Sequence, residues 1–242
     1  MNPQRIARVF GILFLLTWVT AIGGRVLFEH VYTDPRYILG GATDTGVYLG
    51  AVFEFLLIVT QIGTAVVLYP LAKRYSEIGA VGYVSARIME SAFALVGIMS
   101  LLAIVTLRQD LGGTAGGDAA SLLAVGNSLT ATYDWAFLFG PGLVAGVGNG
   151  LILGYVMYRS GLVPRRLAML GLAGGSLHIM GFLGVLFGAF DADSGLRFLS
   201  SVGEMAWEAA LPVYAIWKGF NPSAITSPET RQEAMDPALS AA

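Results

Sequence analysis

Long apolar runs alternate with short segments rich in glycine, proline and charged residues along this chain. Counting the apolar windows predicts six membrane-spanning helices. They cover about residues 7–29, 48–71, 80–107, 132–157, 166–190 and 197–219. Each window reaches about twenty residues or more, the length that a helix needs to cross a hydrocarbon core about 30 Å thick. The pattern therefore predicts an all-α, polytopic integral membrane bundle.

The segments outside these windows are expected to add little structure of their own. Residues 119–130, which precede the fourth window, are expected to form a short interfacial helix. Residues 1–220 are predicted to form a single transmembrane domain. Residues 221–242 are rich in Pro, Ser, Thr and Glu, so they are predicted to form a mobile cytoplasmic tail.

Lysine and arginine residues fall mainly on one side of the predicted membrane. With the N-terminus inside, nine of them face the cytoplasm and three face outward. The inner set is Arg5, Arg8, Lys73, Arg74, Arg159, Arg165, Arg166, Lys218 and Arg231, and the outer set is Arg36, Arg108 and Arg197. Because positive residues in short loops are retained on the cytoplasmic side, the pattern predicts a multi-pass cell-membrane protein with both termini in the cytoplasm.

The composition excludes several classes of protein. The chain is 55% hydrophobic and 12% charged, whereas soluble domains carry about 25% charged residues. A net charge of -2 provides no basic face for nucleic acid, and the absence of cysteine excludes disulfides and thiolate chemistry. The sequence also lacks the common nucleophile, zinc and nucleotide motifs. The expected partners are therefore the lipid bilayer and a small polar ligand or cation, and no cofactor, metal or catalytic residue is indicated.

Eight ionisable side chains fall inside the predicted spans. They are Arg25, Glu54, Arg87, Glu90, Asp134, His178, Glu204 and Glu208. A charge at the bilayer centre costs about 2.5 to 3.5 kcal/mol even on lenient insertion scales, so such residues usually face the bundle interior and have partners. Five carboxylates against two arginines leave an excess of three negative charges. Protons on the carboxyls, a bound cation, a cationic ligand or water must compensate for them.

The spacing of these residues predicts shared helix faces. Arg87 and Glu90 are three residues apart, and Glu204 and Glu208 are four apart, so each pair lies on one side of its helix. Gln61 falls seven residues after Glu54 in the second window, so these two side chains also share a helix face. We expect these faces to enclose a polar core that extends through several depths of the membrane.

Three interpretations of this polar core remain open. In the first, it is the pathway of a small transporter or permease for a proton, a cation or a small polar solute. That pathway would comprise Arg25, Glu54, Gln61, Arg87, Glu90, Asp134, His178, Glu204 and Glu208. In the second, the charges only pin helices together. Arg87 with Glu90 would be one such pair, and Arg25 with Glu54 or Glu204 the other. An intramembrane enzyme acting through paired carboxylates is the least favoured, since nothing marks a nucleophile or a metal.

His178 lies at the midpoint of its predicted helix. It is interpreted either as a hydrogen-bonded structural histidine or as a proton relay or ligand contact. The other histidine, His30, belongs to a predicted outer loop, so the sequence contains no pair of histidines suited to a metal.

Two prolines lie inside predicted spans. Pro141 and Pro212 lack the N–H that would bond the carbonyl four residues earlier, that of Phe137 and Glu208 respectively. A kink is the ordinary outcome, and the edge of a polar cavity is the alternative.

Glycines at four-residue spacing mark the fourth window. They are Gly142, Gly146, Gly150 and Gly154. The counterpart in the next window is Gly171 with Gly175 and Gly184 with Gly188. Such seams let backbones approach closely in a membrane, and a seam within one monomer gives the same pattern as the interface of a homo-oligomer. The alternative function is therefore a structural or regulatory protein that binds a partner or lipid through these seams.

Several stretches of the chain resemble one family of membrane proteins. They are LYPLAKRYSE at 68–77, the face from Arg87 to Glu90, FGPG at 139–142, GYVMYRS at 154–160, LVPR at 162–165 and WKGFNPS at 217–223. The sequence resembles an uncharacterised prokaryotic family, domain of unknown function 4386, from Arg5 to about Ile225. The resemblance implies an integral membrane protein of six or so helices, and it implies no substrate, activity or catalytic residue.

Overall fold

The computed structural model describes residues 2–34, 36–40, 43–111 and 119–225, and all regular structure in these ranges is helical. In chain order the elements are α1 (Pro3–Thr33), η1 (Tyr37–Leu39), α2 (Thr45–Ala72), α3 (Glu77–Leu111), α4 (Ala119–Phe139), η2 (Gly140–Val144), η3 (Gly146–Leu153), α5 (Gly154–Ser160), α6 (Arg165–Leu186), α7 (Gly195–Trp217) and α8 (Pro222–Ile225). The predicted all-α class is confirmed for this part of the chain.

Five helices in the described ranges are long and apolar enough to cross a membrane. They are α1, α2, α3, the continuous helix from Ala119 to Ser160, and α6. The chain is thus a multi-pass membrane protein. The sixth predicted span corresponds to α7, which is long enough but carries Arg197, Glu204 and Glu208 and is therefore less apolar than the other five.

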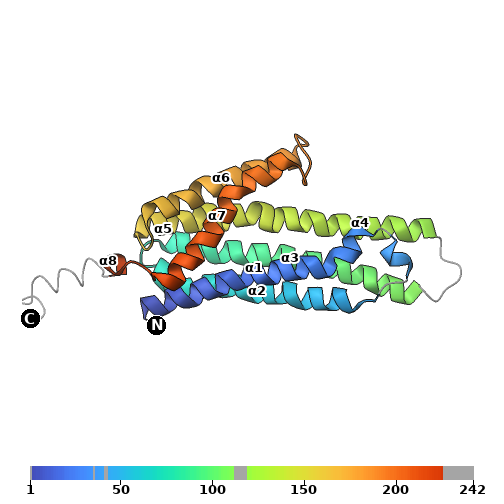
Figure 1. Ribbon diagram of the computed structural model, residues 1–242, viewed down its shortest axis with the longest axis horizontal. Coiled ribbons are helices and arrows are strands. Elements are labelled where there is room, and N and C mark those ends of the chain that lie inside the picture. Colours follow the sequence, from blue (N-terminus) through green and yellow to red (C-terminus); the bar gives the residue numbers. More distant parts are fainter. Residues whose placement is uncertain (1, 35, 41–42, 112–118, 226–242) are drawn as a thin grey trace, which may run out of the picture.

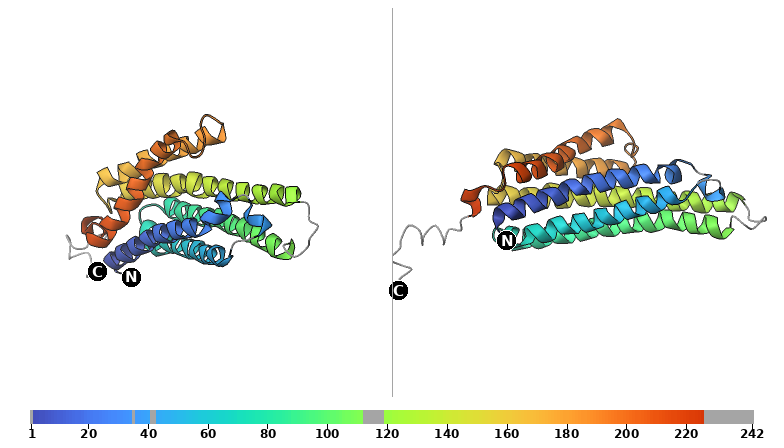
Figure 2. Two further views of the ribbon diagram at one scale, coloured as in Figure 1. Left: turned by 45° about the vertical axis from the view of Figure 1, so that its right-hand side comes forward. Right: turned by 60° about the horizontal axis from the view of Figure 1, so that its bottom comes forward.

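Helices α1, α2, α3 and α4 lie side by side along the longest axis of the molecule (Figure 1). Helices α6 and α7 form a hairpin whose tip leans away from α4, as both further views show (Figure 2). From that tip α7 crosses back to pack against α1 near its N-terminal end. The N-terminal end of α1 and the short helix α8 therefore lie at the same end of the bundle.

The helix from Ala119 to Ser160 corrects one prediction. Residues 119–130 do not form a separate interfacial helix, because α4 continues through them into the span without a break. The helix then widens into π-helical turns over η2 and η3. Pro141, which cannot donate a backbone hydrogen bond, lies in the first turn of η2, and the glycines of η3 permit the wider winding. Such turns are rare and are often found at functional sites.

The glycine seam joins two helices of the same chain. A Cβ atom added to Gly175 of α6 would lie 2.7 Å from the carbonyl oxygen of Gly146 and 2.7 Å from the Cα of Gly150, both in η3. A Cβ on Gly154 would meet the backbone nitrogen of Leu172 at 3.2 Å. Absent side chains thus allow η3 and α6 to touch backbone to backbone, and the seam is filled within the monomer.

Two apolar clusters occupy opposite ends of the bundle. The cluster near the termini includes Phe10, Phe14 and Leu68, and the other includes Phe28 and Leu101. On α1, α2 and α3 the buried polar residues fall between these clusters along the helix, apart from Arg108 at the far end of α3. The packing therefore leaves a polar layer in the middle of the bundle.

At the end opposite the termini, Asp44 connects three elements. It contacts Arg108 as an ion pair and accepts hydrogen bonds from Gln109 Nε2 at 2.8 Å and Tyr37 Oη at 2.9 Å. Partial burial opposes ionisation, but the hydrogen bonds from Gln109, Arg108 and Tyr37 outweigh it and hold the pKa of Asp44 below its usual range. Burial, together with the bond to Asp44, raises the pKa of Tyr37 to about 12.

The end near the termini is fastened through the backbone. Asn221 donates from its amide to the carbonyl of Gly161 at 2.7 Å, and Gln4 donates to the carbonyl of Phe220 at 2.7 Å. The predicted tail, residues 221–242, begins just before α8 and includes it, and its remainder from residue 226 onward lies outside the described residues.

Candidate functional site

A cavity of about 200 Å³ lies between α1, α2, α3, α4, η2, η3 and α7. We call it the interior cavity. Its ionisable and amide-bearing lining residues are Arg25, Glu54, Gln61, Arg87, Glu90, Asn149 and Glu208. Six of these belong to the pathway expected from the sequence, and the structure brings them together in one place.

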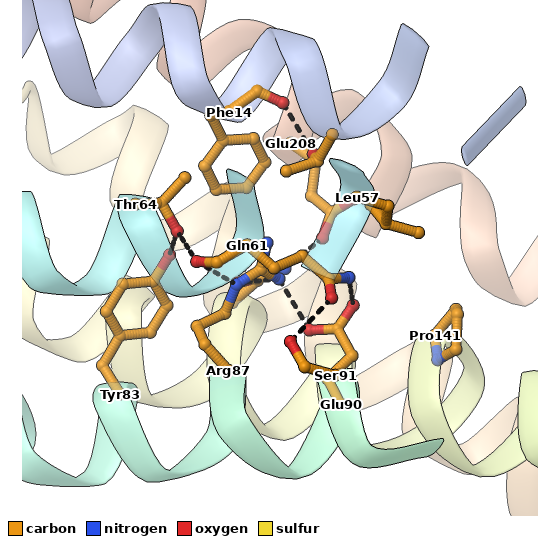
Figure 3. Close-up of polar contacts among 12 residues, drawn as sticks. Phe14, Leu57, Gln61, Thr64, Tyr83, Arg87, Glu90, Ser91, Pro141 and Glu208 are labelled. Atoms are coloured by element: carbon orange, nitrogen blue, oxygen red, sulfur yellow. Dashed lines mark hydrogen bonds and ion pairs between the residues drawn. The ribbon is translucent and has the colours of Figure 1, made fainter. Parts of the chain in front are cut away.

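Arg87 is the centre of the hydrogen-bond network in this cavity (Figure 3). Its side chain is only 2% exposed, and its Nη1 donates to Glu90 Oε2 at 2.6 Å and to Asn149 Oδ1 at 3.2 Å. Its Nε also donates to the backbone carbonyl of Gln61 at 3.4 Å. The guanidinium is therefore held from α2, α3 and η3 at once, and the pairing with Glu90 is the one that their spacing predicts.

Both oxygens of Glu90 have charged or polar donors. One accepts from Arg87, and the other accepts from Gln61 Nε2 at 2.8 Å. The amide oxygen of Gln61 in turn accepts from Ser91 Oγ at 3.1 Å. Because each oxygen is matched, Glu90 is accommodated as an anion by its neighbours (Figure 3).

Asn149 links this ion pair to α7. Its Nδ2 donates to Glu208 Oε1 at 2.5 Å, while its backbone carbonyl accepts from Trp207 Nε1 at 2.9 Å. The sequence interpretation considered the ionisable groups and Gln61, and it missed this residue. A single amide between Gly148 and Gly150 in an otherwise apolar span is the signal that would have found it.

Arg25 and Glu54 line the same cavity without pairing. Glu54 accepts a hydrogen bond from Tyr133 Oη at 3.0 Å. The guanidinium of Arg25 lies over the rings of Tyr32, Tyr133 and Phe137, with its Cζ 4.1 Å, 5.4 Å and 5.2 Å from their centroids. In the described part of the chain the ion pairs are Arg87–Glu90 and Arg108–Asp44, so the expected pairing of Arg25 with a carboxylate is not found.

A second cavity, of about 730 Å³, lies between α1, α4, η2, α6 and α7. We call it the outer cavity. It contains the three pathway residues that the interior cavity does not, which are Asp134, His178 and Glu204. Arg25 and Glu208 border both cavities. The expected pathway is therefore divided between two neighbouring spaces that share a wall.

His178 connects α6 to the π-helical turn. Its Nε2 lies 2.8 Å from the carbonyl oxygen of Pro141, and its Nδ1 lies 3.4 Å from Arg197 Nη1. A carbonyl only accepts, so the proton is on Nε2, and Nδ1 is left to accept from the guanidinium. These contacts match those of a hydrogen-bonded structural histidine.

Arg197 corrects the predicted charge balance. The sequence placed it in an outer loop, but Ser194 caps α7 and puts Arg197 in the first helical turn, where it is buried. Its Nη1 donates to Ser201 Oγ at 2.6 Å. Counting this third arginine lowers the predicted excess of carboxylates inside the bundle from three to two.

Glu204 is the most isolated of the buried carboxylates. It is 2% exposed, and neither of its oxygens has a hydrogen-bond partner. Its Oε2 lies 2.7 Å from the position that a Cβ on Gly150 would occupy. Burying a polar group without a partner costs free energy, so this carboxyl group requires a proton, a cation or a ligand beside it.

A family model described as a domain of unknown function (DUF4386) matches residues 9–219. No curated protein and no solved structure matches the chain. The matched range extends from α1 through α7 and contains every residue of both cavities named above. The resemblance seen in the sequence is confirmed.

Proposed function

The chain belongs to the DUF4386 family, and we propose that it is a small transporter or permease that passes a proton, a cation or a small polar solute through its polar interior. In this proposal α7 is the sixth membrane-spanning helix. Both termini are cytoplasmic, and the protein resides in the cell membrane.

The arrangement of the ends supports this topology. The N-terminal end of α1 and helix α8 lie together (Figure 1). Of the residues expected inside, Arg5 and Arg8 belong to the first turns of α1, and Lys218 caps the C-terminal end of α7 just before α8. An even number of crossings returns the chain to its starting side, which α7 accomplishes by packing along α6 and α1. The excess of positive residues at that end favours the cytoplasm.

Glu90 and Glu208 differ in how fully their oxygens are paired with hydrogen-bond donors and positive charges, and this difference supports a transport site. Glu90 is bonded at both oxygens, by Arg87 and Gln61. Glu208 accepts the amide of Asn149, and no ion pair forms on it within the described residues. With Arg87 already paired to Glu90, Glu208 has no counter-charge of its own. A proton or cation is the natural complement to such a carboxyl group.

The position of Glu208 is the observation that carries the proposal. It borders both the interior cavity and the outer cavity. A solute that moves from one space to the other would pass the residues common to both linings, and Glu208 is the one carboxylate among them. The adjoining wall includes Pro141 of η2 and Ala145, the residue that joins η2 to η3.

The alternative function, assembly through the glycine seams, has less support. Gly146 and Gly150 are covered by Gly175 of the same chain, so this seam presents no free face to a partner.

Flux measurements on proteoliposomes test the proposal. Wild-type protein should carry protons, Na⁺ or K⁺ faster than empty liposomes, and Glu208→Gln should reduce that flux at least tenfold while the protein remains monodisperse. The matched control is Glu29→Gln, since Glu29 is an exposed carboxylate on α1, and it should keep the wild-type rate. Equal flux in both variants, or no wild-type flux above empty liposomes, would contradict the proposal.

A further inference from the structure

Two unsatisfied groups of opposite charge border the outer cavity. Among the described residues, Arg25 Nη1 and both carboxyl oxygens of Glu204 are the buried side-chain polar atoms that have no hydrogen-bond partner. Both side chains line this cavity, yet they form no ion pair with each other. The guanidinium of Arg25 also bonds Tyr133 and lies near the carboxylate of Asp134, so one of its donor atoms and both acceptor atoms of Glu204 are left unmatched around one space.

Glu204 is held where it is by close helix packing. A Cβ on Gly174 would lie 2.6 Å from the backbone nitrogen of Glu204, so α6 and α7 touch at this position. Gly150 of η3 leaves the room that the carboxyl group occupies. Because three helices fix this side chain, it cannot turn toward another residue, so a proton, a cation or a positively charged group of a ligand has to come to it. An ammonium group, which donates charge-assisted hydrogen bonds, matches a buried carboxylate.

Arg25 is oriented for an anionic group. The faces of Tyr32, Tyr133 and Phe137 pack against its guanidinium, whereas its N–H groups point outward in the guanidinium plane. Arg197, on the same cavity, has Ser201 and His178 as neutral partners. A carboxylate or phosphate accepts planar pairs of hydrogen bonds from such arginines.

We infer that the outer cavity binds a small zwitterion, with its ammonium group at Glu204 and its anionic group at Arg25. The volume of about 730 Å³ falls in the range of about 300 to 1,000 Å³ that is usual for small-molecule sites. This site extends the proposed function by naming the class of solute, but the binding itself does not require transport. The same chemistry is present in a free amino acid and in the headgroup of phosphatidylethanolamine.

Binding is measured on the full chain in phosphatidylcholine nanodiscs. The probes are L-alanine and O-phosphoethanolamine, with propionate and ethylamine as the corresponding half-molecules. At least one zwitterion should raise the Tm of wild-type protein, and neither half-molecule should do so at the same concentration. Glu204→Gln and Arg25→Gln should each weaken the Kd of that zwitterion at least tenfold.

The controls are Glu29→Gln and Arg36→Gln, which remove exposed charges and should leave the Kd unchanged. If Glu204→Gln fails to fold, Arg25→Gln decides the outcome. Nanodiscs containing phosphatidylethanolamine identify the source. If phosphatidylethanolamine raises the Tm of the protein and free zwitterions then raise it no further, the site is assigned to the lipid headgroup. If free zwitterions raise the Tm as much as they do in phosphatidylcholine alone, the site is assigned to a free solute.

The inference is overturned if no zwitterion binds in either lipid, if the half-molecules bind as well, or if both variants bind like wild type. Cation flux through Glu208 without zwitterion binding would overturn this inference and leave the proposed function intact. Zwitterion binding without any flux would support this inference and overturn the proposed function.

Discussion

The side-chain amide of Asn149 donates a hydrogen bond of 2.5 Å to Glu208. The oxygen of the same amide accepts from Arg87, so one residue of a π-helical segment connects the acid on α7 to the ion pair on α3. Any displacement of α7 against η3 must stretch or break this bond. The polar interior is therefore coupled to the position of the helix that borders both cavities.

Replacement of Asn149 by alanine should expose this coupling. The change removes the Asn149 donor from Glu208, which keeps only the hydrogen bond from Trp18. It also removes one acceptor of Arg87. Leaving a buried polar group unsatisfied costs about 1 to 3 kcal/mol, so Asn149→Ala should lower the free energy of unfolding by about that amount. Denaturant unfolding in detergent measures it. Asn127→Ala, at an exposed position on α4, is the control, and equal stability of the two variants would count against a structural role for the bridge.

A methyl group at Gly175 should disturb the bundle without changing its oligomeric state. The added Cβ would meet backbone atoms of Gly146 and Gly150 at 2.7 Å, and backbone cannot move aside as a flexible side chain can. Gly175→Ala should therefore lower the stability by about 1 to 3 kcal/mol, measured by thermal unfolding.

Gly195→Ala provides the matched control, because a Cβ at Gly195 has nothing within 4 Å. Light scattering should give the same particle mass for both variants. A loss of mass in Gly175→Ala alone would show that the seam serves an assembly between chains.

The contacts of Asp44 should make the stability depend on pH in the acid range. The pKa of Asp44 is lower in the folded protein than in the unfolded chain, so its contribution is fully present above the ordinary aspartate pKa of about 3.9. It is lost as the pH falls through the folded value. The Tm difference between wild type and Asp44→Asn should thus shrink as the pH is lowered from 7 toward 3. A difference that stays constant would show that the carboxylate does not act through its charge.

The local parts of the site were predictable from the sequence. Arg87 and Glu90 pair because residues three apart lie on one side of a helix, whatever surrounds them. Glu54 and Gln61 reach the same cavity for the same reason. The assignment to membrane proteins followed from the length of the apolar runs alone, since that length does not depend on contacts between helices.

The relationships between helices were not predictable in the same way. Arg25 turns to aromatic faces that come from its own helix and from α4, and only the packing shows that Tyr133 and Phe137 lie there. Arg197 was assigned to a loop because the apolar window begins at its position, whereas the cap at Ser194 starts the helix earlier. Contacts of this kind depend on the tertiary arrangement, which spacing along one helix does not encode.

The proposed transport requires that water-soluble molecules reach the wall shared by the two cavities. The chain contains no cysteine, so single cysteines can be placed without background. Ala145 borders both cavities and is 6% exposed, whereas Ala65 is 1% exposed within the apolar cluster near the termini.

The decisive measurement is the rate at which 2-(trimethylammonium)ethyl methanethiosulfonate modifies each cysteine in reconstituted protein, followed by mass spectrometry. We predict that Ala145→Cys is modified at least tenfold faster than Ala65→Cys. Equal protection of the two cysteines would contradict the claim that this wall faces a solute-accessible space.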